Sequence, residues 1–160
     1  MMIAAGEKVP NVSVMQAKAD GPEPLSTEDY LAGKKTVLFA VPGAYTPTCS
    51  ARHLPGFVEQ AEALRAKGVD QVACISVNDG FVMQAWGEQA GAAGKVDMLA
   101  DGNGEFAKAV GLELDATGFG MGQRSQRYAM IIEDGVAKTI NVEEGGAFEV
   151  SSVEHVLSQL

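Results

Sequence analysis

The sequence predicts an α/β fold in which a central mixed β-sheet is covered by helices on both faces. An apolar run, Thr36–Val41, is followed by a helical pattern and then by a second predicted strand, Gln71–Val77. This is the βαβ order of two neighbouring parallel strands. Later in the chain, two β-rich runs are joined by Asp134-Gly135, a strong signal of an antiparallel hairpin. The two patterns together predict a sheet of mixed direction.

The first 41 residues are predicted to contain two strands and one short helix. Glycines and prolines interrupt residues 1–30, where a short strand is predicted over Asn11–Met15. Ser26–Asp29, followed by two apolar residues, has the pattern of a capped helical turn that ends near Gly33. Thr36–Val41 is apolar throughout, as expected for a strand buried on both faces.

A long helix is predicted from Cys49 to Lys67, because apolar residues recur there at helical spacing and Gly68 is a natural stop. We expect Pro55 to bend this helix, since proline removes a backbone hydrogen bond. The same signals predict the remaining elements: a helix over 81–93, a strand over Val96–Ala100, a helix over Gly104–Val110, hairpin strands over Arg127–Glu133 and Val136–Val142, and a helix over Val153–Leu160. This order fits the thioredoxin-like plan. With no linker or repeat, residues 1–160 are expected to form one domain.

Composition excludes several classes of function. Twelve Lys and Arg against 21 Asp and Glu give a net charge of −9, so we expect no nucleic-acid partner. The longest apolar run, Val37–Val41, is far shorter than the roughly 20 residues that span a membrane. Residues 1–7 do not resemble a signal peptide, and we expect a cytoplasmic protein. Two cysteines and two histidines lack zinc-site spacing, and the glycine-rich segment 118–122 lacks a nucleotide-loop pattern. We therefore expect neither metal nor cofactor.

The candidate site is the segment from Pro42 to Cys49, between the carboxyl end of a buried strand and the start of the long helix. Ligands in open α/β sheets bind at that edge. Cys49 falls in the first helical turn, where free N–H groups and the helix dipole favour an anion such as a thiolate. Thr46 stands where a C-x-x-C motif has its first cysteine. Its hydroxyl can bond a thiolate or a bound oxygen, which favours chemistry on an oxygen substrate.

The pattern P-x-x-x-T-x-x-C, formed by Pro42, Thr46 and Cys49, resembles the active-site motif of peroxiredoxins. Three stretches are similar to the type II, or peroxiredoxin-five-like, subfamily: V-P-G-A-Y-T-P-T-C-S-x-x-H-L-P-G-F, C-I-S-V-N-D and Q-R-Y-A-M-I-I-x-D-G-V. The similarity extends from about residue 6 to residue 160. It implies a thioredoxin-like fold, a homodimer and a thiol peroxidase that acts on hydrogen peroxide or organic hydroperoxides.

The resemblance also implies roles for individual residues. Cys49 would be the peroxidatic cysteine that attacks the O–O bond and becomes a sulfenic acid. Thr46 would bond the thiolate and the peroxide oxygens, and Pro42 would shield the sulfur from water. Arg127 matches the distant arginine of the family, in preference to Arg124, and a cation there would stabilise the thiolate and polarise the O–O bond.

His53 follows Cys49 by four residues, on the same side of a regular helix. One interpretation is a general base for Cys49. The other is a polar residue that orients the backbone or the arginine network, and the resemblance favours this second role. His155 is expected at the surface.

Cys74 is a candidate resolving cysteine, but its expected position argues against that role. It lies about three residues inside the second strand, an offset of roughly 10 Å from Cys49, whereas a disulfide needs Cα atoms within about 7 Å. We therefore interpret Cys74 as a packed strand residue. Many relatives have a resolving cysteine in a region that matches 145–151, which has none here. An external thiol is then expected to reduce Cys49, glutathione with glutaredoxin being favoured over thioredoxin.

The sequence leaves the roles of two phenylalanines undecided, and it allows two alternative functions. Phe119 lies in the glycine-rich segment, expected to be a mobile apolar loop near the pocket that touches substrate or a partner subunit. Phe81 fits the pocket, a dimer seam or the core. The first rival is a cysteine hydrolase that uses Cys49 and His53, although no orienting group or nucleophile elbow is evident. The second is a peroxide-sensing redox switch without sustained turnover.

Overall fold

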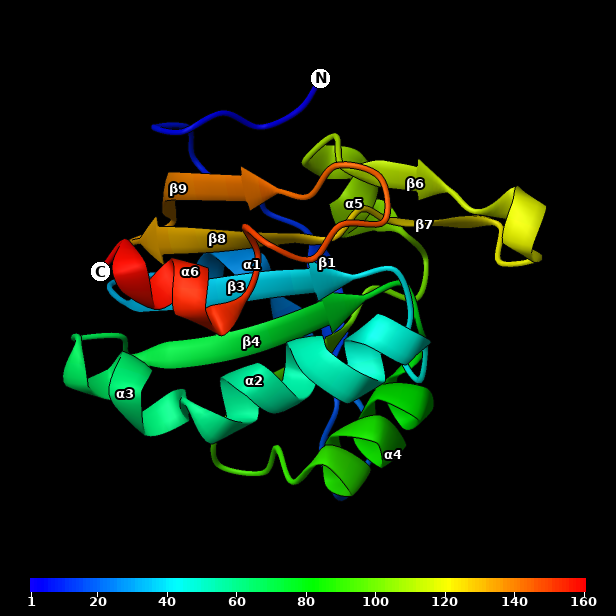
Figure 1. The fold of residues 1–160 in the computed structure, drawn as a ribbon, viewed down its shortest axis with the longest axis horizontal. Coiled ribbons are helices and arrows are strands. Elements are labelled where there is room, and N and C mark those ends of the chain that lie inside the picture. Colours follow the sequence, from blue (N-terminus) through cyan, green and yellow to red (C-terminus); the bar gives the residue numbers. More distant parts are fainter.

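The computed structural model describes residues 1–160, folded around one large sheet (Figure 1). The strands are β1 Ser13–Gln16, β2 Glu23–Ser26, β3 Lys35–Val41, β4 Gln71–Ser76, β5 Asp97–Ala100, β6 Glu113–Asp115, β7 Gln123–Ser125, β8 Tyr128–Glu133 and β9 Val136–Val142. The helices are α1 Thr27–Leu31, α2 Leu54–Glu59, α3 Ala61–Ala66, α4 Gly80–Ala90, α5 Glu105–Ala109 and α6 Val153–Ser158, with a π-helical turn η1 Cys49–His53 and a 3-10 turn η2 Thr117–Phe119. None of these helices combines the length and the apolar character needed to cross a membrane.

The large sheet has seven strands in the order β2-β1-β5-β4-β3-β8-β9. Strands β3 and β4 are parallel neighbours, and β8 lies antiparallel to β3. At the β8–β9 turn, Asp134 and Gly135 both have positive φ, 47° and 78°. Two such residues match the type I′ turn whose twist suits a two-residue hairpin. The predicted mixed sheet, βαβ unit and hairpin are therefore confirmed.

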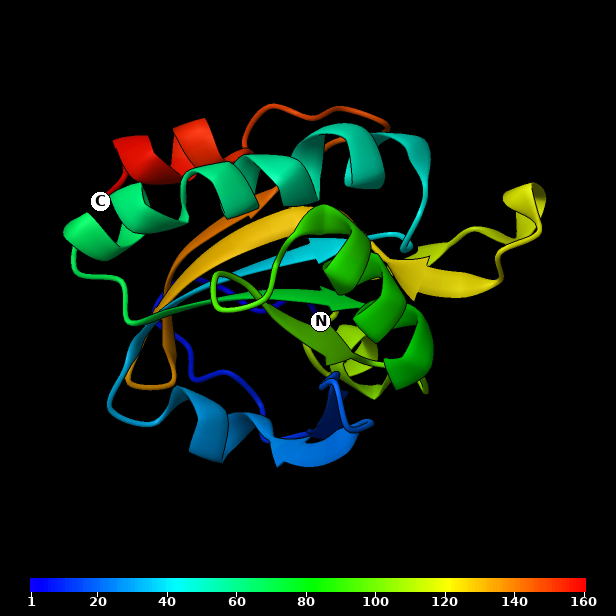
Figure 2. The same ribbon diagram turned by 90° about the horizontal axis from the view of Figure 1, so that it is seen from below.

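Helices cover both faces of this sheet, as predicted. Alternate residues of β3 pack into two separate apolar clusters: Phe39 belongs to one, and Leu38 belongs to the other. Figure 2 shows α2, α3 and α6 on one side of the sheet and α1 on the opposite side. The first face carries the stacked rings of Phe39 and Phe57, 4.1 Å apart. The start of η1, with Cys49, packs on this same face.

The predicted long helix over 49–67 is interrupted at two places. In η1 the Leu54 N–H donates to the Cys49 carbonyl five residues back, so the turn is wider than an α-helical one. The next residue is Pro55, whose ring would clash with the carbonyl four residues before it and which has no N–H to donate. A π-helical turn relieves this conflict. The second interruption is at Gln60, between α2 and α3.

Three short strands were not predicted. Strand β2 contains Pro24 and pairs only with β1, where a proline is tolerated at the edge of a sheet. Strands β6 and β7 pair with each other over three residues each, too few for an alternating pattern. The glycine-rich segment expected to be a loop forms the tip of this second hairpin and overlaps the end of η2. This tip projects from the body of the molecule in Figure 2.

Replacement of Phe57 by alanine is expected to lower the free energy of unfolding by about 3–5 kcal/mol. Its side chain is fully buried and stacks on Phe39, so the change removes that contact and leaves a cavity. Denaturant unfolding would measure the loss. Phe81→Ala is the matched control, because Phe81 is 74% exposed and its loss is expected to cost no more than about 0.5 kcal/mol. Equal losses in the two variants would contradict the assignment of the core.

Candidate active site

The segment from Pro42 to Thr48 carries the chain from the carboxyl end of β3 to the start of η1, where Cys49 lies. Asn78, just after β4, fixes this segment by accepting hydrogen bonds from the Ala44 N–H, at 3.0 Å, and from the Ser76 hydroxyl. Tyr45 has a positive φ of 63°, which is uncommon for a non-glycine residue. Sequence reasoning missed Asn78. Its position after a neighbouring parallel strand, at the same edge of the sheet, was the available signal.

Thr46 is the nearest polar partner of Cys49. Its hydroxyl oxygen lies 2.7 Å from Cys49 Sγ and 2.8 Å from the Gly43 carbonyl oxygen. A hydroxyl has one proton to donate and two lone pairs. When the sulfur is protonated, the S–H can donate to Thr46 while Thr46 donates to Gly43. When the sulfur is ionised, the Thr46 proton can turn to the sulfur. The pair therefore suits both protonation states of Cys49.

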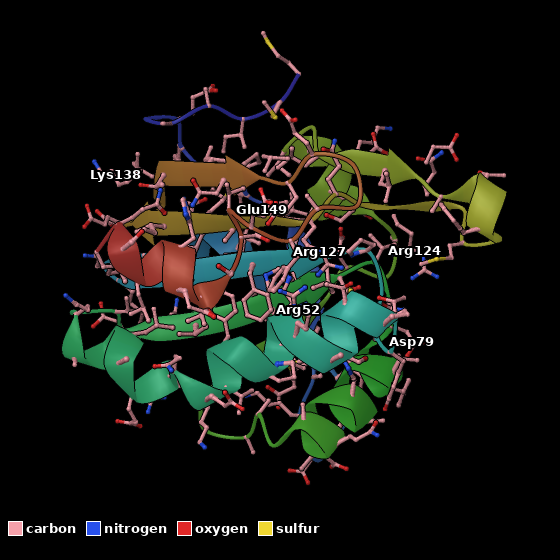
Figure 3. All side chains as sticks on the ribbon, viewed as in Figure 1. Arg52, Asp79, Arg124, Arg127, Lys138 and Glu149 are labelled. Carbon is pink, nitrogen blue, oxygen red and sulfur yellow. The ribbon has the colours of Figure 1, made fainter.

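Arg127, the residue immediately before β8, supplies the positive charge beside the sulfur. Its Nη2 donates to Cys49 Sγ at 3.0 Å, and its Nη1 donates to His53 Nδ1 at 2.8 Å. Arg124 bonds backbone carbonyls instead, through Nε to Met121 at 3.0 Å and through Nη1 to Pro42 at 3.4 Å. The structure therefore places Arg127, and not Arg124, against the sulfur. Figure 3 labels both arginines and shows Arg127 nearer the middle of the molecule than Arg124.

His53 is buried at the end of η1, and both of its ring nitrogens are occupied. Nε2 lies 2.9 Å from the Ser151 carbonyl oxygen, so it carries the proton, and Nδ1 accepts from Arg127. Burial, together with the neighbouring Arg127 charge, lowers the pKa of His53 to about 3. The neutral ring has no nitrogen free to take a proton from Cys49. This arrangement matches the orienting role and not that of a general base.

An open cavity of about 500 Å³ lies against this group. Its walls include Pro42, Thr46, Arg127 and Phe119. The Cys49 side chain is fully buried, but two of these wall residues, Thr46 and Arg127, bond its sulfur. Cys49 itself is not in the cavity wall, so these two polar side chains, which can also bind oxygen atoms, stand between the cavity and the sulfur.

Cys74 lies inside β4, paired in register with Phe39, and is fully buried. Both cysteines are free thiols. Burial raises the pKa of the Cys74 thiol well above its usual range, with a further contribution from Cys49. A buried neutral thiol is a poor nucleophile. The structure thus places Cys74 as a packed strand residue.

The two phenylalanines singled out in the sequence lie in different places. Phe119 is 86% exposed and lines the cavity beside Cys49. Phe81 is not in the core and does not line that cavity. It borders a separate hollow of about 430 Å³ between β1, α4 and the end of β5. As the second residue of α4, it points outward while Met83 and Trp86 pack inward. The dimer seam stays a prediction for both residues.

A cysteine at the start of a helix, at the carboxyl edge of a mixed sheet with helices on both faces, is the arrangement of a thioredoxin-like protein. Comparison with known proteins agrees. The family model described as Redoxin matches residues 4–157. The chain belongs to the redoxin family and, within it, to the peroxiredoxins.

Individual relatives support this assignment. Peroxiredoxin-2E, chloroplastic, of Arabidopsis thaliana is 50% identical over 162 residues, covering 99% of this chain and 69% of the relative. Reduced Prx3 of Vibrio vulnificus in complex with H₂O₂ is 54% identical with a TM-score of 0.94, covering 99% of both chains. A Burkholderia cenocepacia structure provisionally described as a thioredoxin reductase is 50% identical with a TM-score of 0.99, covering 100% and 99%. As a peroxiredoxin, the chain is a thiol peroxidase that reduces peroxides.

Proposed function

We propose that Cys49 is the peroxidatic residue and that the enzyme reduces hydrogen peroxide and organic hydroperoxides. The observation that carries the proposal is the pair of hydrogen bonds from Thr46 and Arg127 to one sulfur, beside an open cavity. The Cys49 thiolate attacks the terminal oxygen of ROOH. The S–O bond forms as the O–O bond breaks, and the leaving RO⁻ takes a proton from solvent. The products are a cysteine sulfenic acid and ROH.

The neighbouring groups have complementary parts in this step. The Arg127 guanidinium stabilises the thiolate and then the negative charge that develops on the leaving oxygen. The Thr46 hydroxyl holds the peroxide oxygen in line with the sulfur. Pro42, on the cavity wall, has no N–H and keeps water away from the sulfenic acid.

We further propose that an external thiol restores Cys49. One thiol condenses with the sulfenic acid, releasing water and leaving a mixed disulfide, and a second thiol releases Cys49 as the external disulfide forms. Two features support this route: Cys74 is buried, and the segment 143–152 has no cysteine. Glutathione with glutaredoxin is the proposed reductant, in preference to thioredoxin.

We also propose a cytoplasmic homodimer. Phe81, Phe119 and Tyr45 expose aromatic rings, and exposed aromatic side chains are common at protein interfaces. Two free thiols are typical of a reducing compartment. Sedimentation velocity would test the dimer, and fluorescence imaging of the tagged chain would test the compartment.

The two rival functions predict different kinetics. A cysteine hydrolase would cleave esters or amides and consume no hydroperoxide. The occupied nitrogens of His53 argue against it, because a hydrolase needs a free base. A peroxide sensor would react about once per molecule and then stop, whereas a peroxidase continues while thiol is supplied.

The decisive experiment follows hydroperoxide consumption with the glutathione–glutaredoxin system and the thioredoxin system side by side. Sustained turnover, faster with glutathione and glutaredoxin, is expected. Mass spectrometry of the oxidised protein should find a sulfenic acid or a glutathione adduct on Cys49. A disulfide between Cys49 and Cys74, or turnover with thioredoxin alone, would contradict the proposed reductant. A complete lack of turnover would contradict the proposed function.

A further inference from the structure

The segment between β9 and α6, residues 143–152, has a role that the reaction scheme above does not yet use. Figure 1 shows this segment crossing from the end of β9 back to α6. Its Phe148 ring lies 4.6 Å from the Arg52 guanidinium carbon and 5.9 Å from that of Arg127. Figure 3 shows the two arginines close to one another in the middle of the molecule. The segment therefore packs directly against the arginine that bonds Cys49.

A single carboxylate oxygen holds this segment in shape. Glu143 Oε2 accepts hydrogen bonds from the Glu149 N–H at 2.7 Å, the Ser151 N–H at 2.8 Å and the Ser151 hydroxyl at 2.6 Å. Glu143 is buried, and burial, the largest single influence, would raise its pKa. The hydrogen bonds from Ser151 and the neighbouring N–H groups outweigh burial and lower the pKa of Glu143. The ionised carboxylate is thus the anchor of residues 149–151.

The anchored residue Ser151 determines which nitrogen of His53 carries its proton. The Ser151 carbonyl can only accept, so the His53 nitrogen 2.9 Å away, Nε2, must donate. The lone pair of Nδ1 then faces Arg127 Nη1 at 2.8 Å and accepts its hydrogen bond. The other tautomer would point an N–H at the guanidinium, which has no acceptor. A chain of contacts therefore joins Glu143, Ser151, His53 and Arg127.

This series of contacts matters because arginine has a long side chain with many rotamers. Only an orientation with Nη2 toward Cys49 gives the 3.0 Å contact with the sulfur. Arg127 has no carboxylate partner among the ion pairs of the structure. Its orientation depends on the neutral His53 and on the covering Phe148 ring, 5.0 Å from the His53 ring. Both are placed by the segment that Glu143 anchors.

We propose that Glu143 is a positioning residue for the peroxidase reaction, which acts through Ser151 and His53 to hold the Arg127 guanidinium against Cys49. The proposal rests on the proposed function of Cys49. Glu143 does not bond the sulfur, and although it lies in the cavity wall, its Oε2 is occupied by the Glu149 N–H and by the N–H and hydroxyl of Ser151. Its effect is to preserve one tautomer of one histidine.

The test compares Glu143→Ala with the neighbouring Glu144→Ala, an exposed glutamate that serves as the matched control. The first readout is the ¹⁵N NMR spectrum of the histidine ring. The chain has only two histidines, and His155→Gln assigns the signals of His53. The second readout is the rate of Cys49 oxidation by hydrogen peroxide in a single turnover. The one tryptophan, Trp86, reports it by fluorescence, because its indole N–H donates to Ser50 next to Cys49.

Wild type is expected to show a neutral His53 protonated on Nε2. In Glu143→Ala, signals of the Nδ1-protonated neutral ring should appear, and oxidation should slow by about tenfold. Glu143→Gln keeps an accepting oxygen and should restore the spectrum and most of the rate, and Glu144→Ala should leave both unchanged.

Slower oxidation in Glu143→Ala with an unaltered His53 spectrum would overturn the proposal, as would an unaltered rate. If Glu143→Ala fails to fold, Ser151→Ala removes one of the three hydrogen bonds and should shift the spectrum in the same direction. An unchanged spectrum in Ser151→Ala would then overturn the proposal. The NMR readout requires no enzymatic turnover, so a failure of the proposed function is distinguishable from a failure of this one.

Discussion

Cys49→Ser is expected to abolish hydroperoxide turnover, with a loss of more than about a thousandfold. A serine hydroxyl is scarcely ionised at neutral pH and is a poor nucleophile toward an O–O bond, whereas a thiolate is a strong one. The contacts from Thr46 and Arg127 would remain available to the serine oxygen. The loss would therefore report the chemistry of the sulfur and not a collapsed site. Steady-state hydroperoxide consumption with glutathione and glutaredoxin measures it.

Cys74→Ser is the matched control, since it makes the same chemical change at the second cysteine. It is expected to retain most of the turnover, because Cys74 is fully buried in β4. A hydroxyl buried at an apolar position costs about 1–3 kcal/mol of stability when it lacks a partner. Cys74→Ala avoids that cost and should behave alike in turnover. Equal loss of activity in the Cys49 and Cys74 variants would refute a mechanism based on one cysteine.

The elements that could be predicted from the sequence are those whose signals are local and long enough. Thr36–Val41 and Gln71–Val77 are both rich in apolar residues, and Asp134-Gly135 supplies two residues that tolerate positive φ. The second hairpin has only three residues in each strand, so no alternation can develop. The π-helical turn escaped prediction for another reason. Pro55 indicates that a helix must adjust, but the choice between a bend and a wider turn depends on packing against the sheet.

In the candidate site, too, contacts between residues close in the sequence could be predicted, whereas contacts between distant residues could not be predicted from spacing. Cys49 and Thr46 lie three residues apart, so their contact follows from the geometry of one turn. Arg127 is distant in the sequence, and its expected position depended on the family resemblance. Its contact with the sulfur follows from the antiparallel pairing of β8 with β3, which brings Tyr128 opposite Ala40.

Glu143 and Ser151 could not be found from the sequence. Neither residue belongs to a recognisable motif, and their contacts arise only when the segment after β9 folds back toward α6. Phe81 is a residue for which a local sequence pattern did not predict the position of the side chain. Its apolar side chain follows Asn78-Asp79-Gly80 at the edge of the sheet, but the helix turns it to the surface.

Arg127→Gln is expected to slow Cys49 oxidation by about a hundredfold to a thousandfold, the range seen when one donor that stabilises a developing charge is lost. Glutamine can still donate hydrogen bonds through its amide N–H groups, but it has no charge to stabilise the thiolate or the leaving oxygen. Arg127→Lys restores the charge, yet an ammonium is a compact point charge without the fork of the guanidinium. It cannot bond His53 and the sulfur in the same geometry, so only part of the rate should return.

Arg124→Gln separates the effect of position from that of net charge. It removes the same charge near the same cavity, but Arg124 bonds the carbonyls of Met121 and Pro42 and not the sulfur. We expect a change of no more than about threefold, because a cation acts strongly only where the charge develops. Single-turnover fluorescence of Trp86 measures all three variants under one condition. Similar losses in Arg124→Gln and Arg127→Gln would mean that the general field of the cavity drives the reaction, and the direct contact between Arg127 and Cys49 would then lose its role.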